Sequence, residues 1–262
     1  MHRNTFTMDL ASHDIIELRD EFWTAARSRA EAYAPAKAAL DYAIATTLLL
    51  LTAPIALLAM ALVRLTSDGP ALYHQRRAGL HGRVFTIHKI RTMYRDSEGG
   101  VARWCLPGDP RVTPVGRFLR WSHIDELPQL INVLRGEMSL IGPRPERPEL
   151  IGELERAIPS YRTRMLVRPG LTGLAQIQLP PDVDLNSVRR KLACDFEYMN
   201  SMSLQLDLRI LAGTALECLG VPGERIGRLL RLPNGRDRIA IQPVDPERDI
   251  PPAPKTATSL LG

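Results

Sequence analysis

The sequence predicts a mostly helical α+β protein in which a membrane helix leads into a small soluble domain. Residues 43–63 form a run of 21 uncharged, mostly apolar residues, and a helix of that length can cross a hydrocarbon core. Short runs with β-branched and aromatic residues follow, separated by Gly, Pro and Asp, which favours a small hairpin. Much of the chain beyond them has apolar residues at helical spacing, which predicts amphipathic helices.

Composition is that of a folded chain with an unusual choice of cations. The 262 residues are 45% hydrophobic and 24% charged, with a formal net charge of +5, so a packed core is expected. Only four of the 34 basic residues are lysine. Arginine binds phosphate with a planar fork, which suits a nucleotide, an anionic lipid or a nucleic acid, but a coding bias explains the excess equally well. The three cysteines are far apart and indicate neither a disulfide framework nor a zinc site.

The chain divides into four predicted regions. They are an amphipathic N-terminal extension over residues 1–35, a membrane helix over 36–65, a catalytic domain over 66–220, and a C-terminal extension with a Pro-rich tail over 221–262. Five prolines among charges between residues 242 and 254 predict an extended or disordered tail.

The membrane segment has two features that argue against a simple span. Pro54 falls in its middle, where it removes a helix hydrogen bond and bends the axis. Basic residues lie on both sides of the segment, so the positive-inside rule gives no orientation. A helix that enters the membrane, bends at Pro54 and returns to the same face satisfies both observations. An ordinary kinked span remains the alternative.

The segment SHIDELPQLINVLRGEMSLIGPRP, residues 122–145, contains adjacent carboxylates at the start of a predicted helix. Leu127, Leu130, Ile131 and Leu134 follow the spacing of a buried helix face. The helix is therefore expected to begin at Asp125 and Glu126, where the positive end of its dipole keeps carboxylates ionised. A plain helix cap explains the pair as well as a functional site does.

Cations with restricted backbones make the functional interpretation more attractive. Arg144 lies between two prolines, Arg168 precedes Pro-Gly, and Lys89 and Arg91 flank one residue of HKIRTM. Such cations can hold a phosphate at low entropic cost. Two acids among several cations are typical of phosphoryl transfer, in which the acids bind a divalent metal or attack phosphorus.

Four ordered blocks of the sequence resemble the monotopic phosphoglycosyl transferases, a family of bacterial sugar transferases. They are IHKIRTM, DPRVTPVGRFLRWSHIDELPQLINVLRGEMSLIGPRPE, VRPGLTGLAQI and KLACDFEYMNSMSLQLDLRIL. Together with the preceding membrane segment, they cover residues 36–215. The resemblance implies that a sugar-1-phosphate moves from a nucleotide diphosphate sugar, usually a UDP-sugar, to a polyprenol phosphate, with Mg²⁺ as cofactor.

The resemblance also implies roles for individual residues. Asp125 matches the nucleophile that forms a covalent phosphosugar intermediate, and Glu126 matches its partner in orienting the site, both being candidate metal ligands. The family's re-entrant helix has a lysine, an aspartate and a proline where this chain has Lys37, Asp41 and Pro54. The candidate substrate- or phosphate-binding residues are Lys89, Arg91, Arg111, Arg144, Arg168, Gln176 and Asp195.

The expected setting follows from the same resemblance. The predicted partners are a UDP-sugar, undecaprenyl phosphate and membrane lipid, with a homodimer left open. The catalytic domain is expected to face the cytoplasm at a bacterial inner membrane, at the first membrane step of exopolysaccharide or lipopolysaccharide assembly. The main alternative is a non-catalytic membrane adaptor of the same fold. Nucleic-acid binding through the arginines is the weakest hypothesis, because it does not explain the membrane segment.

Overall fold

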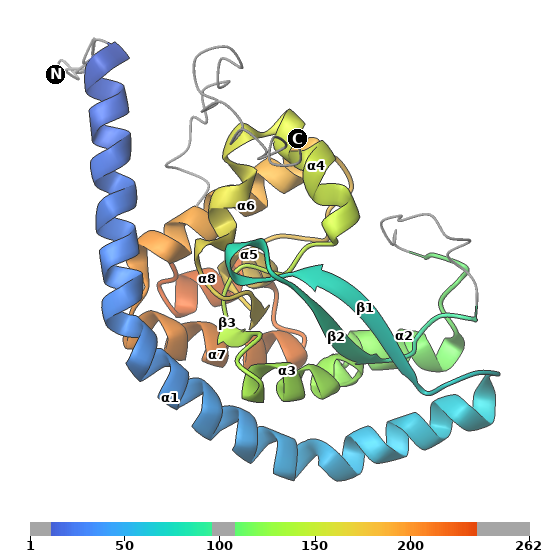
Figure 1. The fold of residues 1–262 in the computed structure, drawn as a ribbon. Coiled ribbons are helices and arrows are strands. Elements are labelled where there is room, and N and C mark those ends of the chain that lie inside the picture. The colour runs from blue at the N-terminus through green and yellow to red at the C-terminus, as the bar shows by residue number, and fades with distance from the viewer. Residues whose placement is uncertain (1–11, 96–107, 235–262) are drawn as a thin grey trace, which may run out of the picture.

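A computed structural model describes residues 12–95 and 108–234 (Figure 1). Within these residues the protein is mostly helical with two small sheets, which confirms the predicted mixture. The α-helices are α1 (Ser12–Thr66), α2 (Pro114–Trp121), α3 (Leu130–Leu134), α4 (Pro148–Ala157), α5 (Leu174–Gln178), α6 (Leu185–Ser201), α7 (Leu204–Cys218) and α8 (Gly223–Leu229). The 3₁₀ helices are η1 (Leu80–Gly82), η2 (Ile124–Gln129) and η3 (Pro159–Leu166). The strands are β1 (Leu72–Ala78), β2 (Val84–Ile90), β3 (Ser139–Ile141) and β4 (Gly170–Thr172).

Helix α1 is continuous over 55 residues and includes both Pro35 and Pro54. The predicted boundary between residues 35 and 36 therefore falls inside one helix. Figure 1 shows α1 running along one side of the domain and then curving beneath it. Its part from Ala32 to Thr66 is long and apolar enough to cross a membrane, and only 11% of its most apolar window is buried. This helix indicates membrane association.

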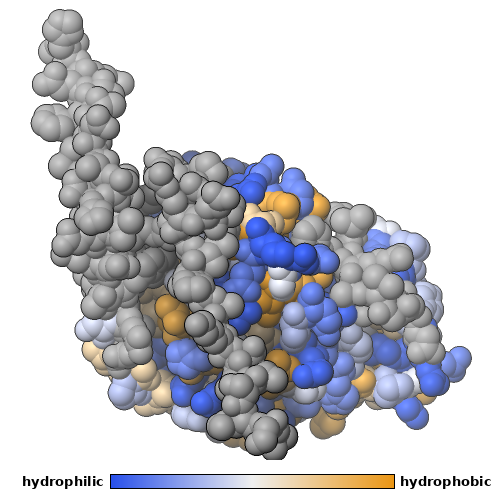
Figure 2. Space-filling view, turned by 45° about the horizontal axis from the view of Figure 1, so that its top comes forward, coloured by the Kyte–Doolittle hydropathy of each residue, from blue (hydrophilic) through white to orange (hydrophobic). Residues whose placement is uncertain are grey.

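Exposed apolar surface is concentrated on the second half of α1. Five leucines there are 62–85% exposed: Leu50, Leu51, Leu57, Leu58 and Leu65. A continuous stripe of this kind on a protein surface marks a contact with lipid or with another protein. Figure 2 shows a different face, on which hydrophilic residues separate smaller apolar patches. The exposed leucines of α1 therefore suit an apolar environment, whereas the face in Figure 2 suits water.

A buried charged cluster joins the first half of α1 to the domain. The Lys37 ammonium lies 2.6 Å from the Asp207 carboxylate, and the Tyr198 hydroxyl donates to the same carboxylate at 2.9 Å. Asp41 accepts a hydrogen bond from the Leu140 backbone N–H at 3.1 Å. Lys37, Asp41 and Asp207 are each at least 93% buried, and buried charges are stable only when they are paired. Lys37 and Asp41 therefore face the globular domain, whereas Pro54 is exposed.

The predicted hairpin is confirmed. β1 and β2 pair antiparallel from Leu72 opposite Ile90 to Ala78 opposite Val84. The turn between them contains His81 and Gly82, both with positive φ, a backbone conformation that glycine adopts without strain. Side chains alternate along a strand, so Tyr73, Gln75 and Arg77 share the sheet face that Lys89 occupies on β2.

Residues 167–219 form one short strand followed by three helices. Gly170–Thr172 is the strand, parallel to β3, and α5 follows it directly. Residues 185–218 form two helices, α6 and α7, because Ser203 caps a new helix through its side chain.

The packed domain continues beyond residue 220. Ile226 of α8 is completely buried, and Gly213 of α7 leaves just enough room for its side chain. Leu232 is also buried. Residues 221–234 are therefore part of the core, and the predicted tail over 242–254 lies outside the described residues.

Candidate active site

The two adjacent carboxylates lie in a tighter helix than expected. Asp125 and Glu126 belong to the 3₁₀ helix η2, which precedes the short helix α3. The residue before η2 is His123, in the left-handed conformation with φ 56°, and no side chain caps η2. The prediction that Asp125 is a helix cap is therefore wrong. Pro128 lies inside η2, where it removes a backbone donor.

The short helix α3 fixes the dyad against the hairpin. Asn132 is fully buried, and its side-chain amide donates to the Thr86 carbonyl and to Glu137, both at 2.7 Å. Leu130 and Val133 are the buried apolar residues of α3, whereas Ile131, which was predicted to be buried, is 37% exposed. The dyad therefore rests on a rigid support.

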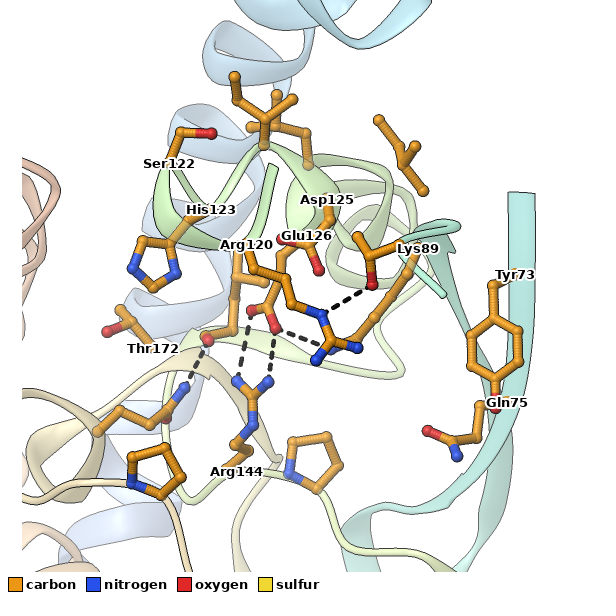
Figure 3. Close-up of a pocket in the computed structure, with 18 of the residues that line it drawn as sticks. Tyr73, Gln75, Lys89, Arg120, Ser122, His123, Asp125, Glu126, Arg144 and Thr172 are labelled. Atoms are coloured by element: carbon orange, nitrogen blue, oxygen red, sulfur yellow. Dashed lines mark hydrogen bonds and ion pairs between the residues drawn. The ribbon is translucent and has the colours of Figure 1, made fainter. Parts of the chain in front are cut away.

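Glu126 is held by two cations. The Lys89 ammonium lies 2.7 Å from its Oε1, and the Arg144 guanidinium donates to both carboxylate oxygens (Figure 3). Although burial opposes its charge, Arg144 and Lys89 hold the pKa of Glu126 well below its usual range. Glu126 is therefore ionised and fixed in position.

Asp125, unlike Glu126, is not held by ion pairs within the described residues. It is only 7% exposed, yet no side-chain hydrogen bond or ion pair links it to another residue in the described parts of the chain. Burial and the adjacent Glu126 raise the pKa of Asp125 to about 6, so this carboxyl is less acidic than an ordinary aspartate but still mainly ionised at neutral pH. Asp125 is thus a desolvated carboxylate whose oxygens remain available to a ligand.

Both carboxylates line a cavity of about 2060 Å³. The predicted residues that also line it are Lys89, Arg91, Arg111, Arg144 and Gln176. Three apolar residues of α1, Ile44, Leu48 and Ile55, form a wall of the same cavity together with Thr52. Charged groups and the exposed apolar helix α1 therefore share one cavity.

Two of the predicted phosphate-binding arginines make structural contacts. Arg91 is buried and donates to the carbonyls of Pro70, Ser67 and Gly69 at 2.7, 3.0 and 3.3 Å. Arg111 binds Asp109 through two nitrogens at 2.6–3.1 Å. These bonds favour a role in shaping the cavity wall.

The other two predicted residues do not line the cavity. The backbone carbonyl of Arg168 closely approaches Gly142. Asp195 is buried and pairs with Arg164 at 2.7 Å, and Arg164 donates to the Arg144 carbonyl at 3.0 Å. Burial raises the pKa of Asp195 to about 6. Asp195 is therefore linked to the backbone of Arg144 through Arg164.

Sequence reasoning missed Arg120 and Arg164. Arg120 lines the cavity from the end of α2, donates to Thr92 at 2.8 Å, and lowers the pKa of Asp125 by its charge. Its position one turn before the dyad was the available signal. Arg164 had no local signal, because its partner Asp195 comes from a different helix.

The chemistry of the dyad suits a magnesium ion shared with a substrate. The described residues contain no group of three or more His, Cys, Asp or Glu side chains able to hold a metal. Mg²⁺, however, is commonly bound by one or two carboxylates together with water and substrate phosphates. Asp125 and Glu126 supply two carboxylates, and the two oxygens of the Asp125 carboxylate make no hydrogen bond or ion pair with the described residues. The residues therefore fit an ion that completes its coordination on a phosphorylated ligand.

Residues 32–220 match the family model described as bacterial sugar transferase. A UDP-glucose:undecaprenyl-phosphate glucose-1-phosphate transferase of Caulobacter vibrioides is 46% identical over 180 residues, which cover 68% of this chain and 67% of that protein. A UDP-N-acetylgalactosamine-undecaprenyl-phosphate N-acetylgalactosaminephosphotransferase of Aeromonas hydrophila is 42% identical over 70% of this chain and 43% of its own length. An exopolysaccharide production protein of Rhizobium leguminosarum is 38% identical over 69% of this chain and 93% of its own length. The chain thus spans two thirds of the first relative and less than half of the second.

Proposed function

Because the chain belongs to the bacterial sugar transferase family, we propose that it transfers a sugar-1-phosphate from a UDP-sugar to undecaprenyl phosphate. One observation carries this proposal. An uncommitted carboxylate, Asp125, lies next to a carboxylate fixed by Lys89 and Arg144, in a cavity that also reaches the apolar helix α1. The relatives named for this reaction use substrates with the same combination of diphosphate and lipid.

In the proposed first step, an oxygen of Asp125 attacks the phosphorus that carries the sugar. A bond forms between that oxygen and phosphorus while the bond from phosphorus to the bridging oxygen breaks, and the bridging oxygen leaves with UMP. The protein then holds an aspartyl phosphosugar. Formation of a covalent intermediate divides one difficult displacement into two easier ones.

In the second step, an oxygen of undecaprenyl phosphate attacks the same phosphorus. The bond to Asp125 breaks, its carboxylate is regenerated, and a diphosphate now joins the lipid to the sugar. Attack by one anion on another requires that positive charge surround the phosphorus. Arg144 and Lys89 provide this charge next to Asp125, and Arg120 adds to it.

Glu126 orients the cations and does not itself attack. Its carboxylate fixes Lys89 and Arg144 in a single arrangement before any ligand binds, which lowers the cost of reorganisation. Mg²⁺, when bound by the dyad and a diphosphate, supplies further positive charge at the phosphate oxygens.

The apolar wall from α1 explains how a lipid substrate reaches a charged centre. Ile44, Leu48 and Ile55 lie on the helix that indicates membrane association and also line the cavity of the dyad. A polyprenol chain can therefore stay against apolar surface while its phosphate approaches Asp125. We place the domain at the cytoplasmic side of the inner membrane, with α1 re-entrant, and tags at both termini should then report the same compartment.

The decisive experiment is a panel of UDP-sugars given to the purified protein with Mg²⁺ and undecaprenyl phosphate, with UMP as the measured product. Omission of the lipid should leave about one equivalent of UMP and a protein that carries the labelled sugar phosphate. Release of UDP in place of UMP would contradict the proposed bond cleavage. No release from any sugar would favour a membrane adaptor of the same fold.

A further inference from the structure

Two buried acceptor oxygens on residues that line the cavity have no hydrogen-bond partner within the described chain. They are Oε1 of Gln176 and Oδ1 of Asp182, and both residues line the cavity. The other polar atom of each side chain is occupied: the Gln176 amide donates to the Leu171 carbonyl at 2.8 Å, and Asp182 pairs with Lys191 at 3.0 Å. Buried polar groups in native proteins almost always find a partner, so these two oxygens indicate a ligand that donates.

The surroundings of these oxygens exclude a phosphate and suit a sugar. Two acceptors repel an anion, and the Lys191 ammonium beside them is already neutralised by Asp182. A hydroxyl group can donate to Asp182 and accept from Lys191 at the same time. Leu179, three residues before Asp182, and Val188 of α6 also line the cavity and offer apolar surface to the C–H groups of a pyranose ring. We call Gln176, Leu179, Asp182, Val188 and Lys191 the α5–α6 arm.

The part of the cavity beside the hairpin has a different character. Tyr73 on β1 and Tyr94 after β2 are among the residues that line the cavity, and aromatic rings can stack on a nucleobase. Figure 3 shows Tyr73 and Gln75 on one side of the dyad and Thr172 on the other. Thr172 leads through Gly173 into α5, so the α5–α6 arm begins on the side away from the hairpin.

We propose that the α5–α6 arm binds the hydroxyl groups of the donor's hexose and selects the sugar, through Gln176 and Asp182. The proposal rests on the proposed function, since the ligand is the UDP-sugar of that reaction. The nucleoside then lies toward Tyr73, the diphosphate at Asp125, and the hexose in the arm.

The loop that carries Asp182 is rigid enough for selective recognition. Pro180 and Pro181 restrict its backbone. Asp184 and Ser187 close a capping box at the start of α6, with bonds of 2.7 and 3.0 Å. Acceptors held in one geometry distinguish hydroxyl configurations, because a misplaced hydroxyl leaves them unpaired.

The test is a binding measurement on full-length protein carrying Asp125→Asn, so that no turnover occurs. Equilibrium dialysis with Mg²⁺ compares UDP-glucose, UDP-galactose, UDP-N-acetylgalactosamine and UDP, which lacks a hexose. Asp182→Asn is expected to raise the Kd of the best-bound UDP-sugar by about tenfold and to change the Kd of UDP by less than about twofold. Gln176→Met is expected to act in the same direction. The matched control Asp184→Asn, in the same loop but outside the cavity, keeps a good cap and should change neither.

Retained UDP binding shows that each variant is folded. Equal weakening of UDP and of every UDP-sugar would overturn the proposal, because the arm would then hold the nucleoside. Unchanged binding of all four ligands, or no gain in affinity from any hexose over UDP, would also overturn it. These outcomes are independent of turnover: a wild-type protein that releases no UMP refutes the transferase reaction, whereas hexose selection is decided by the binding measurements.

Discussion

Two clusters of paired charges in this molecule have similar composition and different surroundings. Near the middle of α1, Lys37 and Tyr198 form hydrogen bonds with the two oxygens of Asp207, which is fully buried. At the dyad, Lys89 and Arg144 satisfy Glu126 in the same way, but Asp125 next to it lines a cavity and makes no side-chain hydrogen bond or ion pair within the described residues. A closed cluster contributes to the structure alone, whereas a cluster with one uncommitted group can also act on a ligand. Four predictions test this contrast, from the largest expected effect to the smallest.

Replacement of the uncommitted carboxylate should remove activity and leave the fold intact. Asp125→Asn keeps the size of the side chain but cannot form an acyl phosphate, so UMP release and covalent labelling should fall at least about a thousandfold. The melting temperature should stay the same or rise, because a desolvated carboxylate is removed. Substantial remaining labelling would place the nucleophile elsewhere.

Removal of one partner from the closed cluster should destabilise the protein strongly. Lys37→Met leaves Asp207 buried without its cation, and the expected loss is about 3–5 kcal/mol in the free energy of unfolding. Chemical unfolding measures it. The double variant Lys37→Met with Asp207→Leu should lose less than the sum of the single variants, because no charge is then left unpaired. Additive losses would show that the two residues are not coupled.

Neutralisation of the Glu126 carboxylate should lower the rate of the reaction but should not change which residue becomes labelled. Glu126→Gln keeps acceptor and donor atoms but releases Lys89 and Arg144 from their ionic contacts, and kcat should fall about a hundredfold. Mass spectrometry of the trapped protein should still find the label on Asp125. A label on residue 126 in the wild type would reverse the assigned roles.

The smallest effects on activity are expected for Asp195 and Arg111, whose side chains make structural contacts. Asp195→Asn weakens the hold of Arg164 on the Arg144 carbonyl, so kcat should fall about tenfold, and Asp195→Glu should recover part of it. Arg111→Gln removes its charged contact with Asp109 and should change kcat/KM by less than about threefold. A loss at Arg111 larger than at Asp195 would restore Arg111 as a phosphate ligand.

Much of the site could be anticipated from local patterns. The hairpin follows from β-branched and aromatic runs between turn residues, and its register places Lys89 opposite Tyr73. The dyad was singled out because adjacent acids precede an apolar stripe and a Pro-flanked Arg144, and the resemblance to a known family then implied their roles. The 3₁₀ form of η2 was not anticipated, because the apolar spacing of residues 127–134 suits an α-helix equally well.

Other features could not be anticipated because they depend on which elements meet. Arg164 looks like an ordinary helical cation until α6 brings Asp195 against it. Residues 221–234 look like the start of a tail until α8 fills the space beside Gly213. The free acceptors of Gln176 and Asp182 are visible only once the cavity around them is known.

The sequence by itself determined the apolar helix, the hairpin, the helical content of the domain and the presence of an acidic dyad, since each follows from the spacing of neighbouring residues. Only the tertiary structure decided that Glu126 is fixed and Asp125 is not, that Lys37 pairs with Asp207, and that the membrane helix and the dyad share a cavity. The physical reason is that burial and charge pairing act between residues far apart in the chain. They can raise the pKa of one carboxylate and lower that of its neighbour even though the two are adjacent in sequence.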